Sequence, residues 1–387
     1  MKLAPRARAL APSETLAINA RAAALRKQGK DVISFAVGEP DFPTPEHVCA
    51  AAKAAIDQGF TRYTPAAGIP ELRSAIATRM GRSLEEIIVT CGGKHALYEV
   101  MQAILSRGDE ILIPAPYWVS FPEMARLAGA KVNAVRTDGS FQLTADAVER
   151  ALTRKSRALI VNSPGNPTGA VYRPEELGAI AELAVQRDLW VISDEVYSAF
   201  VYAGKHASIS SFPGMQDRTV VIDAVSKRYA MTGWRIGWCA APRVVADAVA
   251  GLQSHMTSNA TSIAQRAALA ALTGPQECVE EMVRAFDQRR QVMSGLLDRI
   301  PGVRCPTPEG AFYCFPDVSG LLKGKVRTSA ELCAHLLEEA NIACVPGSAF
   351  GAEGHIRLSY ACSEDDIRKG MERFAEAAAK LGKLAAK

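Results

Sequence analysis

Between residues 86 and 240, short apolar segments alternate with longer segments whose apolar residues have helical spacing. Short strands that alternate with helices predict a mostly parallel sheet with helices on both faces. Strands are expected at 86–90, 110–113, 131–135, 158–162, 190–193, 219–224 and 238–240. Helices are expected at 94–105, after 120, from 144 and at 174–187. We therefore expect an α/β fold with a mostly parallel mixed sheet between layers of helices.

The segments on either side of this alternation are organised differently. Before it we expect helices at 15–29, 45–57 and 70–80, a strand at 33–37 and a turn-rich segment at 61–68. After it, a long charged helix around 277–300 leads to strands at 310–316, 342–346 and 356–360 and helices at 329–340 and 364–378, which predict a smaller α+β domain. The 387 residues suffice for roughly two domains. We expect an arm that joins the small domain (1–40), a large domain (41–280) and a small C-terminal domain (281–387).

Composition and charge argue against several classes of protein. The chain has 45 basic and 41 acidic side chains and no basic stripe with interleaved aromatic residues, so no nucleic-acid partner is expected. It lacks an apolar run of membrane-spanning length and a secretory signal, so no membrane association is expected. Nine scattered cysteines without a C-x-x-C pair are typical of a reduced, cytoplasmic protein without disulfides or zinc. No G-x-G-x-x-G follows a strand, which argues against a dinucleotide oxidoreductase.

Glycines and polar side chains follow the expected strands where each strand ends, which is where open α/β sheets bind ligands. Gly92 and Gly93 follow the strand at 86–90 and open a helix. Free amides at such a helix start could hold a phosphate, although two glycines alone more often form a tight turn. Asn166 stands between two prolines after 158–162, and Asp194 ends the strand at 190–193, with Tyr197 three residues later. A carboxylate this deep in the fold needs a partner.

A lysine follows the strand expected at 219–224. Lys227 comes three residues after that strand, and Arg235 comes eight residues later. A lysine that is desolvated or lies beside another cation loses its proton more easily and can attack a carbonyl group. A single lysine at a strand end is more often exposed to solvent. The residues at the neighbouring strand ends favour the functional interpretation.

Taken together, these residues resemble the class I and II aminotransferases, which are pyridoxal 5′-phosphate (PLP) enzymes of fold type I. The resemblance rests on Asn166-Pro167-x-Gly169, Asp194-x-x-Tyr197 and Ser226-Lys227-x(7)-Arg235, in this order, and covers nearly the whole chain. Residues 92–94, 116–118, 231–235 and 355–360 are most similar to the bacterial branch of aspartate aminotransferases. The family's lysine signature usually begins with Gly or Ser where this chain has Ala224, so one hydroxyl ligand to the phosphate is absent.

The resemblance implies a role for each cofactor residue. Lys227 would bind PLP covalently and then act as the general base, while Asp194 would keep the pyridine nitrogen protonated. Asn166 and Tyr197 would hydrogen-bond the phenolic oxygen of the cofactor, which lowers the pKa of its link to Lys227. Lys227, Asp194 and Tyr197 are thus the expected catalytic residues. The remaining cofactor residues would hold the phosphate and the ring; they are Gly92, Gly93, Lys94, Arg235 and Trp118. The resemblance also implies a homodimer with shared active sites, in which Tyr63 would come from the partner subunit.

The expected substrates are a small amino acid and a 2-oxo acid, with L-aspartate as donor and 2-oxoglutarate as acceptor in a ping-pong reaction. Arg357 would hold the α-carboxylate, with Gly38, Asn166 and Trp118 beside it. By resemblance, the distal carboxylate would be bound by Lys94 with Ser13 and Thr15 of the N-terminal arm. As a first-turn helix residue, Lys94 could instead face solvent.

Several alternatives share the cofactor residues and differ in the substrate pocket. They are an aromatic, kynurenine or prephenate aminotransferase and a PLP-dependent β-lyase. Relatives that accept prephenate have a basic residue before the Pro-Ser of the arm, and this chain has Ala11 there. A PLP-fold sensor domain of a transcription regulator would need a fused winged-helix domain, but only about 30 residues precede the first expected strand.

Overall fold

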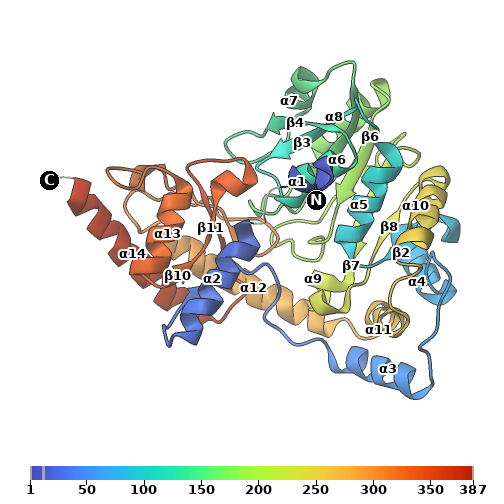
Figure 1. The fold of residues 1–387 in the computed structure, drawn as a ribbon, viewed down its shortest axis with the longest axis horizontal. Helices are drawn as coiled ribbons and strands as arrows, with labels where there is room; N and C mark the ends of the chain where they lie inside the picture. Colours follow the sequence, from blue (N-terminus) through green and yellow to red (C-terminus); the bar gives the residue numbers. More distant parts are fainter. Residues whose placement is uncertain (1, 11–13, 386–387) are drawn as a thin grey trace.

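A seven-stranded sheet forms the centre of the computed structural model, which describes residues 2–10 and 14–385 (Figure 1). Its strands lie in the order β2-β8-β7-β6-β5-β3-β4. Their bounds are β2 (Ile87–Thr90), β3 (Glu110–Ala115), β4 (Lys131–Arg136), β5 (Ser156–Asn162), β6 (Trp190–Asp194), β7 (Thr219–Ala224) and β8 (Gly237–Ala240). Only β8 runs antiparallel to its neighbours β2 and β7. The mostly parallel mixed sheet expected from the sequence is confirmed.

Helices cover both faces of this sheet because successive strand residues point to opposite faces. Ile160, Ile192 and Ile222 pack against one layer, which consists of α5 (Gly93–Ile104), α6 (Ser120–Leu127) and α10 (Arg243–Met256). Val161 and Val191 face the opposite side, where α7 (Ala145–Ala151) and α8 (Pro174–Gln186) pack. The rest of that side is covered by α3 (Glu46–Asp57), α4 (Pro70–Met80) and α11 (Ser262–Thr273). The central strands are therefore buried, whereas the edge strand β4 is partly exposed.

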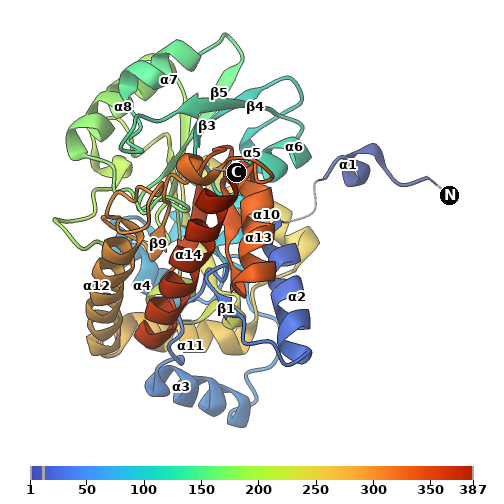
Figure 2. The same ribbon diagram turned by 90° about the vertical axis from the view of Figure 1, so that its left-hand side faces the viewer.

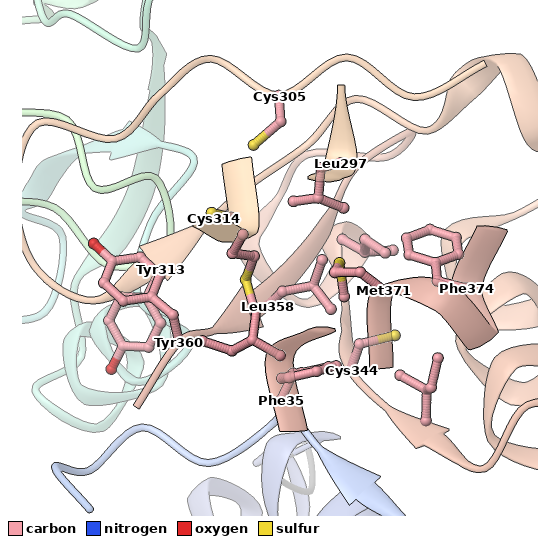
Figure 3. Close-up of a cluster of buried hydrophobic side chains, with 14 of the residues drawn as sticks. Phe35, Leu297, Cys305, Tyr313, Cys314, Cys344, Leu358, Tyr360, Met371 and Phe374 are labelled. Atoms are coloured by element: carbon pink, nitrogen blue, oxygen red, sulfur yellow. The ribbon is translucent and has the colours of Figure 1, made fainter. Parts of the chain in front are cut away.

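A second, smaller group of elements lies beside the carboxyl ends of the parallel strands (Figures 1 and 2). It contains the three-stranded sheet β11-β12-β9 and the parallel pair β1-β10. The strands are β1 (Ile33–Ser34), β9 (Tyr313–Cys314), β10 (Ile342–Ala343), β11 (Val345–Pro346) and β12 (Ile356–Ser359). The helices are α2 (Glu14–Lys27), α12 (Glu277–Leu297), α13 (Ser329–Glu339) and α14 (Glu364–Ala385). Many of their apolar side chains form a buried cluster around Phe35, Leu358 and Phe374 (Figure 3), while Ala22 of α2, Ala343 and Val345 belong to a second, smaller cluster.

Three strands expected in this second region are shorter or differently arranged. The segment 342–346 is not one strand, because Cys344 separates β10 from β11 and the two belong to different sheets. The strand expected at 33–37 ends at Ser34, and that at 310–316 is reduced to β9. In each case the apolar run continues as buried irregular chain, which an apolar pattern alone does not distinguish from a strand.

Short helical turns complete the described chain. They are α1 (Pro5–Arg8), α9 (Val225–Arg228) and the 3-10 turns η1 (Leu84–Glu86), η2 (Ile209–Ser211), η3 (Thr232–Trp234), η4 (Ser319–Leu321) and η5 (Gly347–Phe350). All nine cysteines are free thiols. Within residues 2–10 and 14–385, no helix combines the length and the apolar character needed to cross a membrane.

Candidate active site

A cavity of about 580 Å³ lies where β5, β6 and β7 end and the second group of elements begins. This volume is typical of sites for small molecules and cofactors. Most residues expected at the site line it, although they come from distant parts of the sequence. They are Thr15, Gly38, Gly93, Lys94, Trp118, Asn166, Asp194, Tyr197, Lys227, Arg235 and Arg357.

Lys227 reaches this cavity from α9, the short turn that follows β7. Its Nζ donates a hydrogen bond to the Gly38 carbonyl oxygen at 2.5 Å. The pKa of the Lys227 amine is lowered to about 8, chiefly by burial; Glu39 opposes this shift, and the nearby Arg357 and Arg235 contribute to it. A substantial fraction of the amine is therefore uncharged near neutral pH, as a carbonyl nucleophile requires.

Asp194 lies at the end of β6, with only 4% of its surface exposed. Its Oδ1 accepts one long hydrogen bond, from the Val196 amide at 3.4 Å, and none of the ion pairs in the described chain involves it. Burial raises the pKa of its carboxyl group to about 7. A cationic N–H group placed in the cavity would stabilise this carboxylate, and the protonated pyridine nitrogen of PLP is such a group.

An anion site is formed where Arg235 meets the start of α5. The Arg235 guanidinium donates to the carbonyl oxygens of Thr232, at 2.8 Å, and Cys91, at 3.3 Å. Gly92 has a φ of 89°, and a Cβ there would lie 2.5 Å from Arg235 Nη2, so only glycine lets the guanidinium come this close. The first amides of α5 have no partner within the helix. Helix amides beside a guanidinium fit the phosphate of PLP.

Arg357 enters the cavity from β12, with 3% of its surface exposed. Its guanidinium donates to Asn166 Oδ1 at 3.0 Å and to the Ala36 carbonyl oxygen at 2.8 Å, while its Nε has no partner. It lies 4.6 Å from the ring centroid of Tyr313. No carboxylate of the described residues forms an ion pair with it. A buried cation without an acidic partner is costly, so the site favours binding of a carboxylate ligand.

Lys94 is a further cation in the cavity. Its Nζ lies 4.8 Å from the ring centroid of Trp118, and burial together with Arg235 lowers its pKa. Lys94 lines the cavity and is also exposed to solvent, so the two positions expected for it are compatible. Since Arg235 faces the phosphate site and Arg357 is held near Asn166, Lys94 is available to a second anionic group.

Three expected site residues are not part of the cavity lining. Gly92 lies directly behind it, against Arg235. Tyr63 is 88% exposed and does not line the cavity of its own chain. Ser13 lies outside the described residues, as does Ala11.

Sequence reasoning missed several residues that line the cavity, among them Asn19, Asn162 and Tyr313. Asn162 is the last residue of β5, and its Nδ2 donates to the Asp194 carbonyl oxygen at 3.1 Å. Its place at a strand end was a usable signal. Tyr313 lies in an apolar run of the second region, and nothing in that run indicates contact with the large sheet.

Comparison with known proteins gives a consistent result over almost the full length. The family model for aminotransferase class I and II matches residues 30–374. The aspartate aminotransferase of Geobacillus stearothermophilus is 46% identical over 385 residues, covering 97% of this chain and 98% of that protein. The aspartate/prephenate aminotransferase of Thermus thermophilus is 45% identical, covering 96% and 98%.

Solved structures agree with this finding. The aspartate aminotransferase of Thermus thermophilus with maleate superposes with a TM-score of 0.93 at 44% identity, covering 97% of this chain and all of that one. The aspartate aminotransferase of Rhizobium meliloti gives a TM-score of 0.94 at 40% identity, covering 98% and 99%.

Proposed function

The chain belongs to the class I and II aminotransferases, and from this we propose that it transfers the amino group of L-aspartate to 2-oxoglutarate with PLP as its cofactor. The observation that carries the proposal is the shared cavity of Lys227, Asp194 and Arg235. An amine, a buried carboxylate and an anion site there match the aldehyde, the pyridine nitrogen and the phosphate of PLP. The relatives named aspartate aminotransferase support the choice of substrate.

In this proposal each polar group of the cofactor has a partner in the chain. Arg235 and the amides of Gly93 and Lys94 bind the phosphate, Asp194 faces the ring nitrogen, and Trp118 packs against the ring. Asn166 and Tyr197 donate hydrogen bonds to its phenolic oxygen. When bound, the cofactor supplies an electron sink for the negative charge that develops at the substrate Cα.

The other cavity residues act on the substrate. Arg357 binds the α-carboxylate, which gives its buried guanidinium the anionic partner that it lacks. Lys94 binds the distal carboxylate, with Thr15 beside it; Ser13 remains a proposed third ligand. Lys227 moves the proton from Cα. Because its pKa is lowered, part of its amine is uncharged near neutral pH and can accept that proton. The reaction then runs in two halves, with amino acid and 2-oxo acid binding in turn.

An absorbance and half-reaction experiment tests this function. Purified protein supplied with PLP should show a cofactor band, and L-aspartate should convert that band within one turnover. The panel should also contain the amino donors glutamate, phenylalanine and kynurenine, a β-lyase substrate, and prephenate as a 2-oxo acid acceptor for the aminated cofactor, because the alternatives differ only in these. Prephenate belongs in the panel also because the Thermus relative is named for it. Faster conversion by a monocarboxylic aromatic amino acid than by aspartate would contradict the proposal.

Lys94→Ala should lower kcat/KM for aspartate roughly tenfold or more, because the distal carboxylate would be desolvated without a counter-ion. The value for alanine, which has no distal carboxylate, should change less than about threefold, because the variant keeps the backbone amide that faces the phosphate. The ratio of the two kcat/KM values therefore isolates the distal contact. Lys131→Ala, which removes an exposed lysine at the sheet edge, is the matched control. An unchanged ratio would reject Lys94 as the specificity residue.

We further propose that two copies of the chain form a homodimer with shared active sites. Tyr63 is exposed on its own chain, and α1 stands away from the body of the molecule (Figure 2). Leu3, just before α1, is 70% exposed, which suits an arm that packs on a second copy. The guanidinium and lysine groups described above come from one chain, and Tyr63 is the residue that we expect the partner to add.

Mixing two defective variants tests the shared site. Tyr63→Ala and Lys227→Ala should each be impaired, but a refolded equal mixture should regain about one quarter of native activity. Random pairing makes half of the dimers mixed, and each mixed dimer has one site with both native residues. Size measurement should give a dimer in every case. A mixture no more active than the average of its parts would show that Tyr63 does not act across subunits.

A further inference from the structure

Tyr313 joins two parts of the cavity that are expected to have separate tasks. Its hydroxyl oxygen lies 2.7 Å from that of Tyr197, and the two form a buried hydrogen bond. The centroid of its ring lies 4.6 Å from Arg357 Cζ. One side chain therefore touches both the phenol on the cofactor side and the guanidinium on the substrate side.

The short strand β9 explains this position. Tyr313 of β9 pairs with Ser359 of β12, and Arg357 lies two residues before Ser359 on the same strand. The side chains of Tyr313 and Arg357 are therefore diagonal neighbours on one face of the sheet. Tyr197 belongs to the segment that follows β6 of the large sheet. Figure 3 shows Tyr313 at one edge of the apolar cluster, with its hydroxyl directed away from the apolar side chains. The Tyr313–Tyr197 hydrogen bond thus connects the two groups of elements.

The Tyr313 hydroxyl is also held in place by the backbone at Gly38. A Cβ on Gly38 would lie 2.7 Å from Tyr313 Oη, so the hydroxyl rests against the backbone that accepts the Lys227 hydrogen bond. Burial raises the pKa of both Tyr313 and Tyr197. Both phenols therefore keep their protons at neutral pH, and each can donate one hydrogen bond.

We propose that Tyr313 is a positioning residue for transamination: its hydroxyl donates to Tyr197 and its ring holds Arg357, so that one side chain aligns the cofactor oxygen with the carboxylate site. The inference rests on the proposed function, because it assigns Tyr197 to the cofactor. When Tyr197 donates to an acceptor in the cavity, its oxygen is free to accept from Tyr313. Hydrogen bonds arranged in series in this way strengthen one another.

Tyr313→Phe should separate the two roles, because it removes the hydroxyl and keeps the ring. Without the hydrogen bond from Tyr313, Tyr197 becomes a weaker donor to the cofactor oxygen. The pH midpoint of the cofactor absorbance should therefore rise by about 0.5 to 1 unit. The kcat value should fall several-fold, while KM for aspartate should stay within about twofold because the ring still faces Arg357. Tyr313→Leu removes the ring as well and should raise that KM about tenfold.

Two controls make the test specific. Tyr360→Phe removes another buried hydroxyl of the same cluster, one that donates to the Ala311 carbonyl oxygen at 3.2 Å and does not reach the cavity. It should leave the midpoint unchanged. In a Tyr197→Phe background, adding Tyr313→Phe should shift the midpoint no further, because the donor has lost its acceptor.

The outcomes distinguish this inference from the proposed function. A parent enzyme that binds no PLP or does not transaminate would overturn both. A working parent whose midpoint is the same in Tyr313→Phe would overturn the inference alone. An equal shift with and without Tyr197 would likewise overturn it, since Tyr313 would then act by another route.

Discussion

Lys227→Ala should lower kcat/KM for transamination by at least about 10⁴-fold, which corresponds to roughly 5.5 kcal/mol of transition-state stabilisation. The variant loses both the amine that would bond to the cofactor and the base that would move the Cα proton. Among the described residues that line the cavity, the other lysine is Lys94, whose amine is held against Trp118.

Lys227→Arg is the matched variant for this prediction. Arginine restores the positive charge and much of the volume, but its guanidinium stays protonated and cannot serve as nucleophile or base. Its activity should therefore be as low as that of the alanine variant. Borohydride reduction followed by peptide mass analysis should find PLP attached to Lys227 in the parent and to neither variant. Attachment at another lysine, or an active arginine variant, would refute the assignment.

The sheet and the residues at its strand ends could be predicted from sequence because both depend on local patterns. The segment 219–224 matches β7 from end to end, since its apolar residues and the following turn define a buried strand without reference to other parts of the chain. Asp194 and Lys227 follow such strands, and parallel strands bring their carboxyl ends to one edge. Their shared cavity is thus a consequence of topology.

Contacts between the two groups of elements could not be predicted in this way. Tyr313 reaches Tyr197 because β9 pairs with β12; the sequence indicates a strand at 356–360 but not which segment pairs with it. The division of 342–346 by Cys344 also depends on strand pairing, because β10 pairs with the distant β1 whereas β11 pairs with the nearby β12. Tyr63 was assigned from resemblance alone, and the single chain shows only that its side chain is exposed.

Asp194→Asn should have two opposite effects, one on catalysis and one on the stability of the cofactor-free protein. Asparagine keeps the shape of the side chain but cannot hold a proton on the ring nitrogen by charge. A hydrogen bond to a charged group contributes on the order of 1.5–3 kcal/mol, so kcat should fall about 100-fold. Asp223→Asn is the control, because Asp223 is also buried and on a neighbouring strand, but it does not line the cavity. Its kcat should stay within about threefold of the parent.

The stability effect follows from the raised pKa of Asp194, which is about 7 in the folded protein against an ordinary 3.8. Between these values the folded chain binds more protons than the unfolded chain, so the free energy of unfolding falls as pH rises through this window. The amide of Asp194→Asn does not titrate, so the variant should gain stability over the parent, and the gain should be about 2 kcal/mol larger at pH 8 than at pH 5.5. Urea unfolding of both cofactor-free proteins at the two pH values measures the difference. A gain that does not depend on pH would mean that the Asp194 carboxylate is solvated or paired, and the cavity would then lack the unpaired acid that a ring cation needs.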